Sequence, residues 1–211
     1  MKISFKIHVA FLSLAAAVLM AGCESNEKTA SASNPPPAIM SPPPAAVSQP
    51  AVPVTNAPPV EKTVVRIKAG ASSPVTDSSG NVWLADQGFS GGDSIERPDV
   101  TVTNTTQPEI YRSEHYSMDS FSWPLANGKY LVKLHFCETY EGITGPGQRV
   151  FSFNVQGQEF KDFDVWAKAG GPFTAHVETV PVEITDNKLL ITFTSNIENP
   201  QINGIEIVPQ P

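Results

Sequence analysis

The stretch KYLVKLHFC, residues 129–137, decides the fold class, because its apolar side chains recur at every second position. A period of two is the pattern of a β-strand, in which successive side chains point to opposite faces. One face of the predicted strand carries Tyr130, Val132, Leu134 and Phe136. A face this apolar has to be buried against a second layer, so the pattern predicts a strand that covers a hydrophobic core.

Asn127-Gly128 stands directly before this strand and favours a tight turn, because both residues tolerate a positive φ. We therefore predict a hairpin in which residues 120–125 pair with residues 129–137. Pro124 lacks a backbone donor, which predicts an irregular end for the partner strand.

The same alternation recurs through the rest of the chain. Further strands are predicted at residues 149–155, 177–184, 188–194 and 201–208. Gln156-Gly157 predicts another turn, before Glu159-Phe160. No segment holds a helical apolar stripe over three turns. The sequence therefore predicts an all-β fold, an antiparallel jelly-roll-like β-sandwich.

Residues 86–107 have the composition of a long loop, and loops of this length in compact domains are usually functional or disordered. Phe89 is an aromatic side chain within this stretch that has few apolar neighbours in the sequence. It either holds the loop against the body of the domain or faces a ligand.

The first 22 residues predict a lipoprotein signal peptide: Lys2 and Lys6, an apolar run, then Ala21-Gly22 before Cys23. The apolar run is shorter than the ~20 residues of a membrane-spanning helix. Cys23 is thus the expected lipidation site, and the lipid would attach the chain to a membrane. Glu24 is not the aspartate of the familiar inner-membrane retention signal, so we expect the cell envelope, at the outer membrane. A plain secretory peptide is the alternative.

A proline-rich segment follows, and residues 23–62 are predicted to be a disordered tether that precedes one domain at residues 63–209. Removal of residues 1–22 would leave a formal net charge of about −9. This acidity argues against nucleic acid as a partner. If Cys23 is lipidated, Cys137 has no cysteine left to pair with, and a small buried thiol is its expected role.

Catalytic signatures are absent from the sequence, and no metal or cofactor is expected. The histidines lack metal-ligand spacing, and Asp77, Asp86 and Asp93 form no recognisable calcium loop. Carboxylates that could in principle supply an acid/base pair for glycoside hydrolysis are Glu138, Glu141, Asp162, Asp164 and Glu198. An acidic domain contains such pairs by chance, so we expect a protein that is not an enzyme.

Four side chains form the combination expected of a sugar-binding site, in which aromatic rings stack on the apolar C–H faces of sugars and carboxylates and amides bind the hydroxyls. They are Tyr116, Tyr140, Glu198 and Asn199. Each tyrosine is about as well explained by core or edge packing.

An ordered series of motifs from Val64 to Val208 resembles the malectin domain. The motifs are RIKAG (66–70), DSSGNVWLAD (77–86), IYRSEHY (110–116), GKYLVKLHFCETY (128–140), GQRVFSFNV (147–155), FD (163–164), AG (169–170) and ENPQINGIEI (198–207). The resemblance implies a β-sandwich that binds carbohydrate without cleaving it, through loops at one end. Malectin itself recognises a glucose disaccharide on N-glycans.

Matched to the family's motifs, the sugar-contacting tyrosines correspond to Tyr116 and Tyr140, and the contacting aspartate to Glu198. Two positions depart from the family. Glu141 replaces an aromatic residue. A further loop tyrosine of the family has no clear match, although Phe89 could take its place, where a phenyl ring could stack but could not donate a hydrogen bond. The resemblance thus implies carbohydrate as the partner. The alternative is a structural module that binds another envelope protein, since plant relatives bind peptides or proteins.

Overall fold

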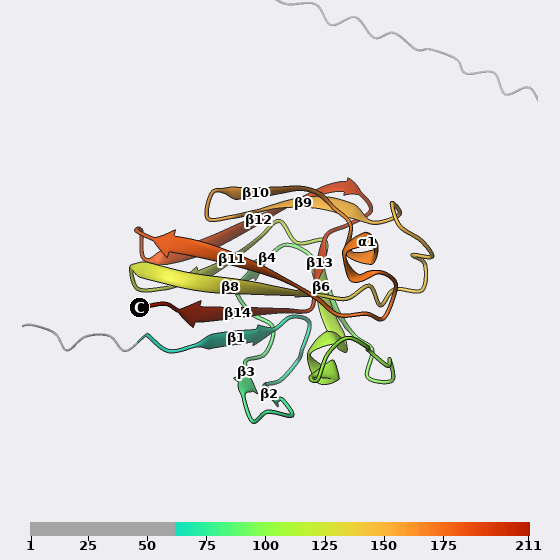
Figure 1. Ribbon diagram of the computed structural model, residues 1–211, viewed down its shortest axis with the longest axis horizontal. Helices are drawn as coiled ribbons and strands as arrows, with labels where there is room; N and C mark the ends of the chain where they lie inside the picture. The colour runs from blue at the N-terminus through green and yellow to red at the C-terminus, as the bar shows by residue number, and fades with distance from the viewer. Residues whose placement is uncertain (1–61) are drawn as a thin grey trace, which may run out of the picture. The chain divides into compact units, whose positions relative to one another are not determined.

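The computed structural model describes residues 62–211 (Figure 1). The predicted signal peptide, the lipidation site Cys23 and the tether up to residue 61 lie outside the described residues. In the described part, no helix is long and apolar enough to cross a membrane.

Two antiparallel sheets form the body of the domain and lie over one another as two layers (Figure 1). In spatial order, the four-stranded sheet contains β1 (Val65–Lys68), β14 (Gly204–Pro209), β8 (Gly128–Phe136) and β11 (His176–Ile184). The five-stranded sheet contains β10 (Gln158–Phe163), β9 (Val150–Val155), β12 (Lys188–Ile197), β7 (Ser120–Pro124) and β4 (Phe89–Ser90). This arrangement confirms the predicted antiparallel β-sandwich.

The core lies between these sheets and is rich in phenylalanine. Phe136 on β8 reaches across to β9 and β10, with ring centroids 5.9 Å from Phe153 and 4.9 Å from Phe163. All four apolar residues predicted on one face of the strand at 129–137 are at most 1% exposed. Burial of side chains of this size contributes ~1.5–3 kcal/mol each, so this interface is a main source of stability.

The predicted hairpin between residues 120–125 and 129–137 is wrong. β7 pairs with β12 and β4, whereas β8 lies between β14 and β11 in the other sheet. Asn127-Gly128 therefore carries the chain from one sheet to the other, and the Asn127 side chain accepts a 2.9 Å hydrogen bond from the Asn187 backbone. Alternation identifies the buried face of each strand but not its neighbour in the sheet.

A third sheet, of three short strands, lies at the end of the sandwich where β8 ends. It contains β13 (Gln201–Ile202), β6 (Ser113–Tyr116) and β5 (Asp93–Glu96), in this order. β13 leads into β14 through Asn203 alone, which makes the small sheet continuous with the four-stranded sheet. The stretch 86–107, predicted as a loop, thus contributes β4 and β5, because both find pairing partners far away in the sequence.

The remaining elements are small. They are the two-stranded ribbon of β2 (Val75–Thr76) and β3 (Val82–Trp83), the 3-10 helix η1 (Pro108–Tyr111) and the helix α1 (Val165–Ala169). The Asp164 carboxylate caps α1 by accepting a 3.0 Å hydrogen bond from the Ala167 backbone. Gly170 ends the helix in the left-handed conformation.

Gly70 is a position where only glycine fits, and we expect Gly70→Ala to destabilise the fold by about 2–5 kcal/mol. Its φ is +76°, and a Cβ there would overlap the backbone of Glu114 on β6. A left-handed non-glycine residue costs ~1–2 kcal/mol, and overpacking ~1–3 kcal/mol. Gly80 is the matched control, because its φ is +84° but a Cβ would meet nothing within 4 Å. Equal losses of unfolding free energy for Gly80→Ala and Gly70→Ala in urea titrations would refute the steric argument.

Candidate functional site

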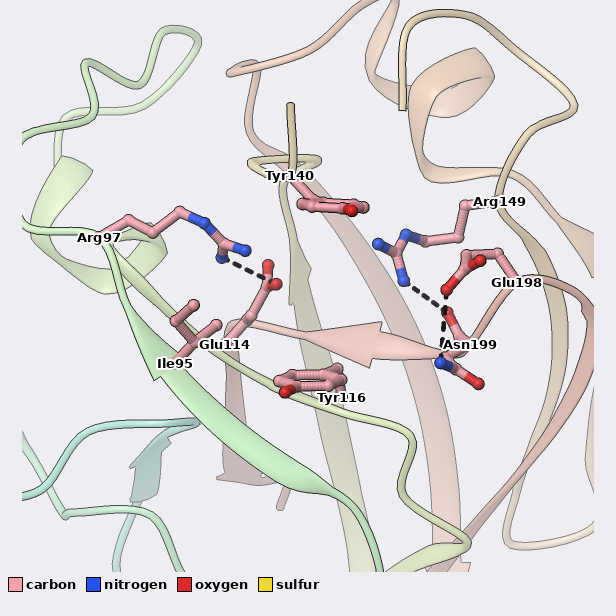
Figure 2. Close-up of a pocket in the computed structure, with 8 residues that line it drawn as sticks. All are labelled: Ile95, Arg97, Glu114, Tyr116, Tyr140, Arg149, Glu198 and Asn199. Atoms are coloured by element: carbon pink, nitrogen blue, oxygen red, sulfur yellow. Dashed lines mark hydrogen bonds and ion pairs between the residues drawn. The ribbon is translucent and has the colours of Figure 1, made fainter. Parts of the chain in front are cut away.

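A pocket of about 300 Å³ opens beside the small sheet. Figure 2 shows its lining, which comes from five separate segments of the chain. The lining residues are Ile95, Arg97, Glu114, Tyr116, Tyr140, Arg149, Glu198 and Asn199. The structure therefore brings together four of the five side chains predicted to bind ligand, namely Tyr116, Tyr140, Glu198 and Asn199.

Strand register explains why Tyr116 and Glu114 share one wall. The two residues are separated by one position on β6, so their side chains project from the same face of the small sheet. Ile95 on β5 stands opposite Glu114 in the antiparallel ladder and therefore adds an apolar side chain to that face. The intervening His115 points to the other face of this sheet.

Tyr140 stands just past the end of β8 and forms the opposite wall. Its backbone N–H donates a 3.0 Å hydrogen bond to the Glu138 carboxylate, which fixes the turn, and its side chain is 48% exposed. In Figure 2 the rings of Tyr116 and Tyr140 turn their faces toward each other across the pocket. A half-exposed aromatic ring with one face turned to a pocket is well placed to stack on a ligand.

Arg97 and Glu114 form an ion pair on one flank of the pocket. The Arg97 Nη1 to Glu114 Oε1 distance is 2.8 Å, and the same nitrogen donates to the Thr139 hydroxyl at 3.2 Å. Thr139 in turn donates to the second oxygen of Glu114 at 3.0 Å. Both Glu114 oxygens are thus engaged, and this triangle joins the small sheet to the turn that carries Tyr140.

Arg149 and Glu138 form a second, more deeply buried ion pair. Arg149 Nε lies 2.7 Å from Glu138 Oε2, and the two side chains are 5% and 1% exposed. Burial raises the pKa of the Glu138 carboxyl, although the Arg149 charge and the hydrogen bonds from Tyr140 and Arg149 oppose this effect. Arg149 Nη1 also donates a 2.7 Å hydrogen bond to the backbone carbonyl of Asn199. This arginine therefore holds the loop that carries Glu198 and Asn199.

Glu198 lines the pocket from that loop with a φ of +62°, a left-handed conformation that is uncommon for a residue other than glycine. The Asn199 side chain donates a 3.3 Å hydrogen bond to the Glu198 carboxylate. These two polar groups face Tyr116 and Glu114 from the opposite flank (Figure 2). Strain of this kind is often found at ligand-binding positions.

Phe89 is the predicted ligand-binding residue that the structure places elsewhere. It does not line the pocket, and its ring stacks on His115 at 4.3 Å and packs on Phe121 at 5.1 Å. Both centroid distances correspond to close aromatic packing. Phe89 thus holds its segment against the body of the domain, the first of the two roles weighed from sequence.

His115 ties the same segment to β6. Its two ring nitrogens lie 2.9 Å from an Asp86 carboxylate oxygen and 3.0 Å from the Gly91 carbonyl oxygen. Burial lowers the pKa of His115, but the hydrogen bonds to these two acceptors and the charges of Asp86 and Asp93 outweigh it, so the pKa is raised. Only the doubly protonated ring can donate to both acceptors.

We expect the stabilising effect of His115 to be larger in mild acid than in mild alkali. Because its folded-state pKa lies above that of the unfolded chain, the contribution is complete below the unfolded pKa of ~6.5 and is lost as pH rises through the folded value. The neutral ring keeps only one hydrogen bond, a loss of about 1 kcal/mol. Urea titrations of His115→Gln and of the wild-type protein at about pH 5.5 and 8.5 measure the effect. Equal destabilisation by His115→Gln at both pH values would contradict this prediction.

The carboxylates considered for hydrolysis do not form a facing pair. Glu138 is buried against Arg149, Asp164 caps α1, and Asp162 accepts a hydrogen bond from Asn196. Of the five candidates, only Glu198 lines the pocket. A glycosidase needs two carboxyl groups that flank the bond to be cleaved.

Two further residues considered from sequence, Asp77 and Cys137, are engaged in packing or hydrogen bonds within the fold. Asp77 accepts hydrogen bonds from Trp83 and Gln107, and among residues 62–211 no group of three potential metal ligands occurs. Cys137 is a buried free thiol, and burial raises its pKa to about 12, with the negative charges of Glu138 and Glu114 acting in the same direction. A thiol protonated to this degree is a poor nucleophile, in agreement with a packing role.

Four pocket residues were not singled out from sequence, namely Ile95, Arg97, Glu114 and Arg149. Glu114 could have been predicted from sequence, because in the motif SEHY (113–116) it lies on the same strand face as Tyr116. Arg149 stands at the start of a predicted strand, and nothing in the sequence indicates its ion pair with Glu138. Ile95 and Arg97 lie within residues 86–107, which the sequence predicts to be a loop.

Comparisons with known proteins agree with this architecture. The profile described as Malectin domain matches residues 63–205. Malectin-B of Xenopus laevis is 31% identical over 111 residues, which cover 48% of this chain and 39% of the relative. One chain in the crystal structure of the plant peptide RALF23 in complex with FER and LLG2 matches with a TM-score of 0.61 at 22% identity. The match covers 69% of this chain and 48% of the chain in that complex.

A Bacteroides uniformis β-glucuronidase matches with a TM-score of 0.64 at 17% identity, over 71% of this chain and 18% of the enzyme. At such identities the solved structures establish the fold alone. The chain spans less than half the length of these relatives. The match to the profile over most of the described residues carries the assignment, and the chain belongs to the malectin domain family.

Proposed function

We propose that this domain binds carbohydrate without cleaving it, in the pocket between Tyr116 and Tyr140. The observation that carries the proposal is the pair of tyrosine rings facing each other across a pocket with charged and amide groups on its flanks (Figure 2). A pyranose ring has apolar C–H faces and a polar perimeter. Aromatic walls and polar flanks complement those two features.

The polar flanks offer hydrogen-bonding groups of both kinds. Arg149 uses Nε for Glu138 and Nη1 for the Asn199 carbonyl. Within residues 62–211 its third nitrogen, Nη2, has no hydrogen-bond partner and can donate to a ligand. Glu198 can accept hydrogen bonds from two vicinal hydroxyls, and the amide of Asn199 can both donate and accept. Glu141 removes one stacking surface of the family, which argues against the glucose disaccharide of animal malectin as the ligand.

Non-catalytic binding is favoured over hydrolysis by the state of the pocket carboxylates. Glu114 has both oxygens engaged by Arg97 and Thr139, so Glu198 is the remaining pocket carboxylate with no cationic partner among the described residues. One such group cannot serve as both acid and base. The family resemblance to malectins, which are binding proteins, supports the same conclusion.

A peptide or protein ligand is the second candidate, and the strand β5 favours it. All four of its residues are exposed, and it is the edge strand of the small sheet beside the pocket. An extended peptide can add to such an edge through backbone hydrogen bonds. A structural relative is named for a complex with a plant peptide, which makes this mode of binding a reasonable alternative.

A glycan array followed by calorimetry with the purified protein tests the proposal. Binding of at least one class of oligosaccharide at millimolar or lower concentration, displaced by free sugar, is the expected result. Absence of binding to every glycan on the array would refute carbohydrate recognition. Retention of a peptide from a random library in the same pocket would then favour the second candidate.

We further propose that Cys23, which lies outside the described residues, carries a lipid that anchors the protein in the bacterial cell envelope. The support is the order of basic residues, apolar run and Ala21-Gly22-Cys23 in the sequence. Labelling of cells with a radioactive fatty acid is expected to label the protein, and Cys23→Ser to remove the label. Labelling that persists in Cys23→Ser would refute this assignment.

A further inference from the structure

The turn that carries Tyr140 contains a glycine, Gly142, whose surroundings leave no room for a side chain. A Cβ at this position would lie 2.5 Å from Cε1 and from Cζ of the Tyr140 ring and 2.8 Å from its hydroxyl oxygen. Carbon atoms that are not bonded to each other prefer a separation of ~3.5–4.0 Å. The Tyr140 ring therefore occupies the space that a side chain at position 142 would need.

The backbone conformation of Gly142 does not require glycine. Its φ lies outside the left-handed range, unlike that of Gly147 in the same loop. Alanine can adopt such a conformation without strain. The three heavy atoms nearest to a Cβ at position 142 all belong to Tyr140, so contact with this ring is the main consequence of a side chain there.

The backbone of this turn is held in place on both sides of Gly142. The Tyr140 N–H donates a 3.0 Å hydrogen bond to the Glu138 carboxylate, and the Ile143 N–H donates a 3.0 Å hydrogen bond to the Tyr140 carbonyl. The Ile143 side chain is buried and anchors the end of the turn. Gly142 cannot withdraw from the ring without the loss of these contacts.

The Tyr140 ring offers less resistance than the turn. The residue is 48% exposed, and rotation about its side-chain torsions moves the ring at a small energetic cost. A side chain at position 142 would therefore displace the ring and leave the turn in place. Because the Tyr140 ring faces Tyr116 across the pocket, its displacement changes the gap between the two rings (Figure 2).

We infer that Gly142 is a positioning residue of the sugar site: because it has no side chain, the Tyr140 ring can lie against the turn, and this sets the gap between Tyr140 and Tyr116. The inference rests on the proposed carbohydrate binding. Gly142 does not itself line the pocket. A larger residue at this position weakens stacking on a sugar through the ring that it displaces.

Calorimetry with the best ligand from the glycan array tests this inference. Gly142→Ala is expected to weaken binding by about tenfold, and its midpoint in urea should stay close to that of the wild-type protein. Gly145→Ala is the matched control in the same loop, because a Cβ there would meet only the Gln148 side chain, at 3.9 Å. Its affinity should not change. In a Tyr140→Ala background, Gly142→Ala should cause no further loss, since no ring is left to displace.

Fluorine NMR reports the position of the ring without any sugar. The full chain labelled with 3-fluorotyrosine contains four labelled positions, and Tyr140→Phe identifies the resonance of Tyr140. This resonance is expected to shift in Gly142→Ala and to stay in place in Gly145→Ala. A general loss of structure would move the other three tyrosine resonances as well.

Unchanged affinity in Gly142→Ala, or a Tyr140 resonance that does not move, would overturn the inference and leave the proposed function intact. An equal loss of affinity on adding Gly142→Ala to the wild-type protein and to Tyr140→Ala would overturn it too, because residue 142 would then act without the ring. A Gly142→Ala protein that does not fold would show that the ring does not yield, with the same consequence. If the wild-type protein binds no glycan, the proposed function is refuted, and the fluorine spectra still decide whether Gly142 sets the position of the ring.

Discussion

Tyr140→Ala is expected to weaken sugar binding by about thirtyfold, a loss of ~2 kcal/mol typical of a central aromatic contact. Its ring lines one wall of the pocket and the residue is 48% exposed, so its truncation should affect binding more than folding. The free energy of unfolding should therefore change by no more than ~0.5 kcal/mol. Tyr116→Ala should weaken binding similarly, because its ring forms the facing wall (Figure 2).

Two further variants separate stacking from other effects. Tyr140→Phe keeps the ring and should retain most of the affinity, since only the hydroxyl is lost. Val82→Ala truncates an exposed apolar side chain outside the pocket and should leave affinity unchanged. Calorimetry with the best ligand from the glycan array measures all four variants. Unchanged affinity in Tyr116→Ala and Tyr140→Ala would show that sugars bind elsewhere.

Much of the fold could be predicted because alternation reports which side chains are buried. The faces of β8 and β9 were identified correctly, since Val132 and Phe151 belong to runs with a strict period of two. Pairing could not be predicted in the same way. β7 ends only a few residues before β8 begins, yet the two strands belong to different sheets, and alternation specifies a strand's buried face without specifying its pairing partner.

The tyrosine walls of the site could be anticipated, whereas its charged flanks could not. Tyr140 follows the predicted strand at residues 129–137, and family motifs mark both Tyr116 and Tyr140. The pairs Arg97–Glu114 and Glu138–Arg149 are formed between residues on different elements. In the sequence each member resembles an ordinary surface charge, and only the folded arrangement shows which of them are buried together.

Arg149→Met is expected to lower the free energy of unfolding by about 3–5 kcal/mol at neutral pH. The variant removes the partner of Glu138, and a buried carboxylate without its cation is strongly destabilising. The Asn199 carbonyl also loses its hydrogen bond, so the Glu198 loop should loosen and sugar affinity should fall. Urea titration and calorimetry measure the two effects separately.

The pH dependence of this loss identifies its cause. In the variant, burial would raise the Glu138 pKa further because the opposing Arg149 charge is gone. A folded-state pKa above the unfolded value means that the folded protein binds more protons, so stability falls as pH rises. The cost of Arg149→Met should therefore be smaller at about pH 5 than at about pH 7.5.

The double variant Glu138→Gln/Arg149→Met gives the decisive comparison, because a neutral amide in place of the carboxylate removes the buried charge. We expect it to recover most of the lost stability without recovering sugar affinity, since neither substitution restores the donor to the Asn199 carbonyl. Recovery of both properties would show that Arg149 affects the site only through overall stability. A double variant as unstable as Arg149→Met would show that packing around the guanidinium, and not the Glu138 charge, accounts for the loss.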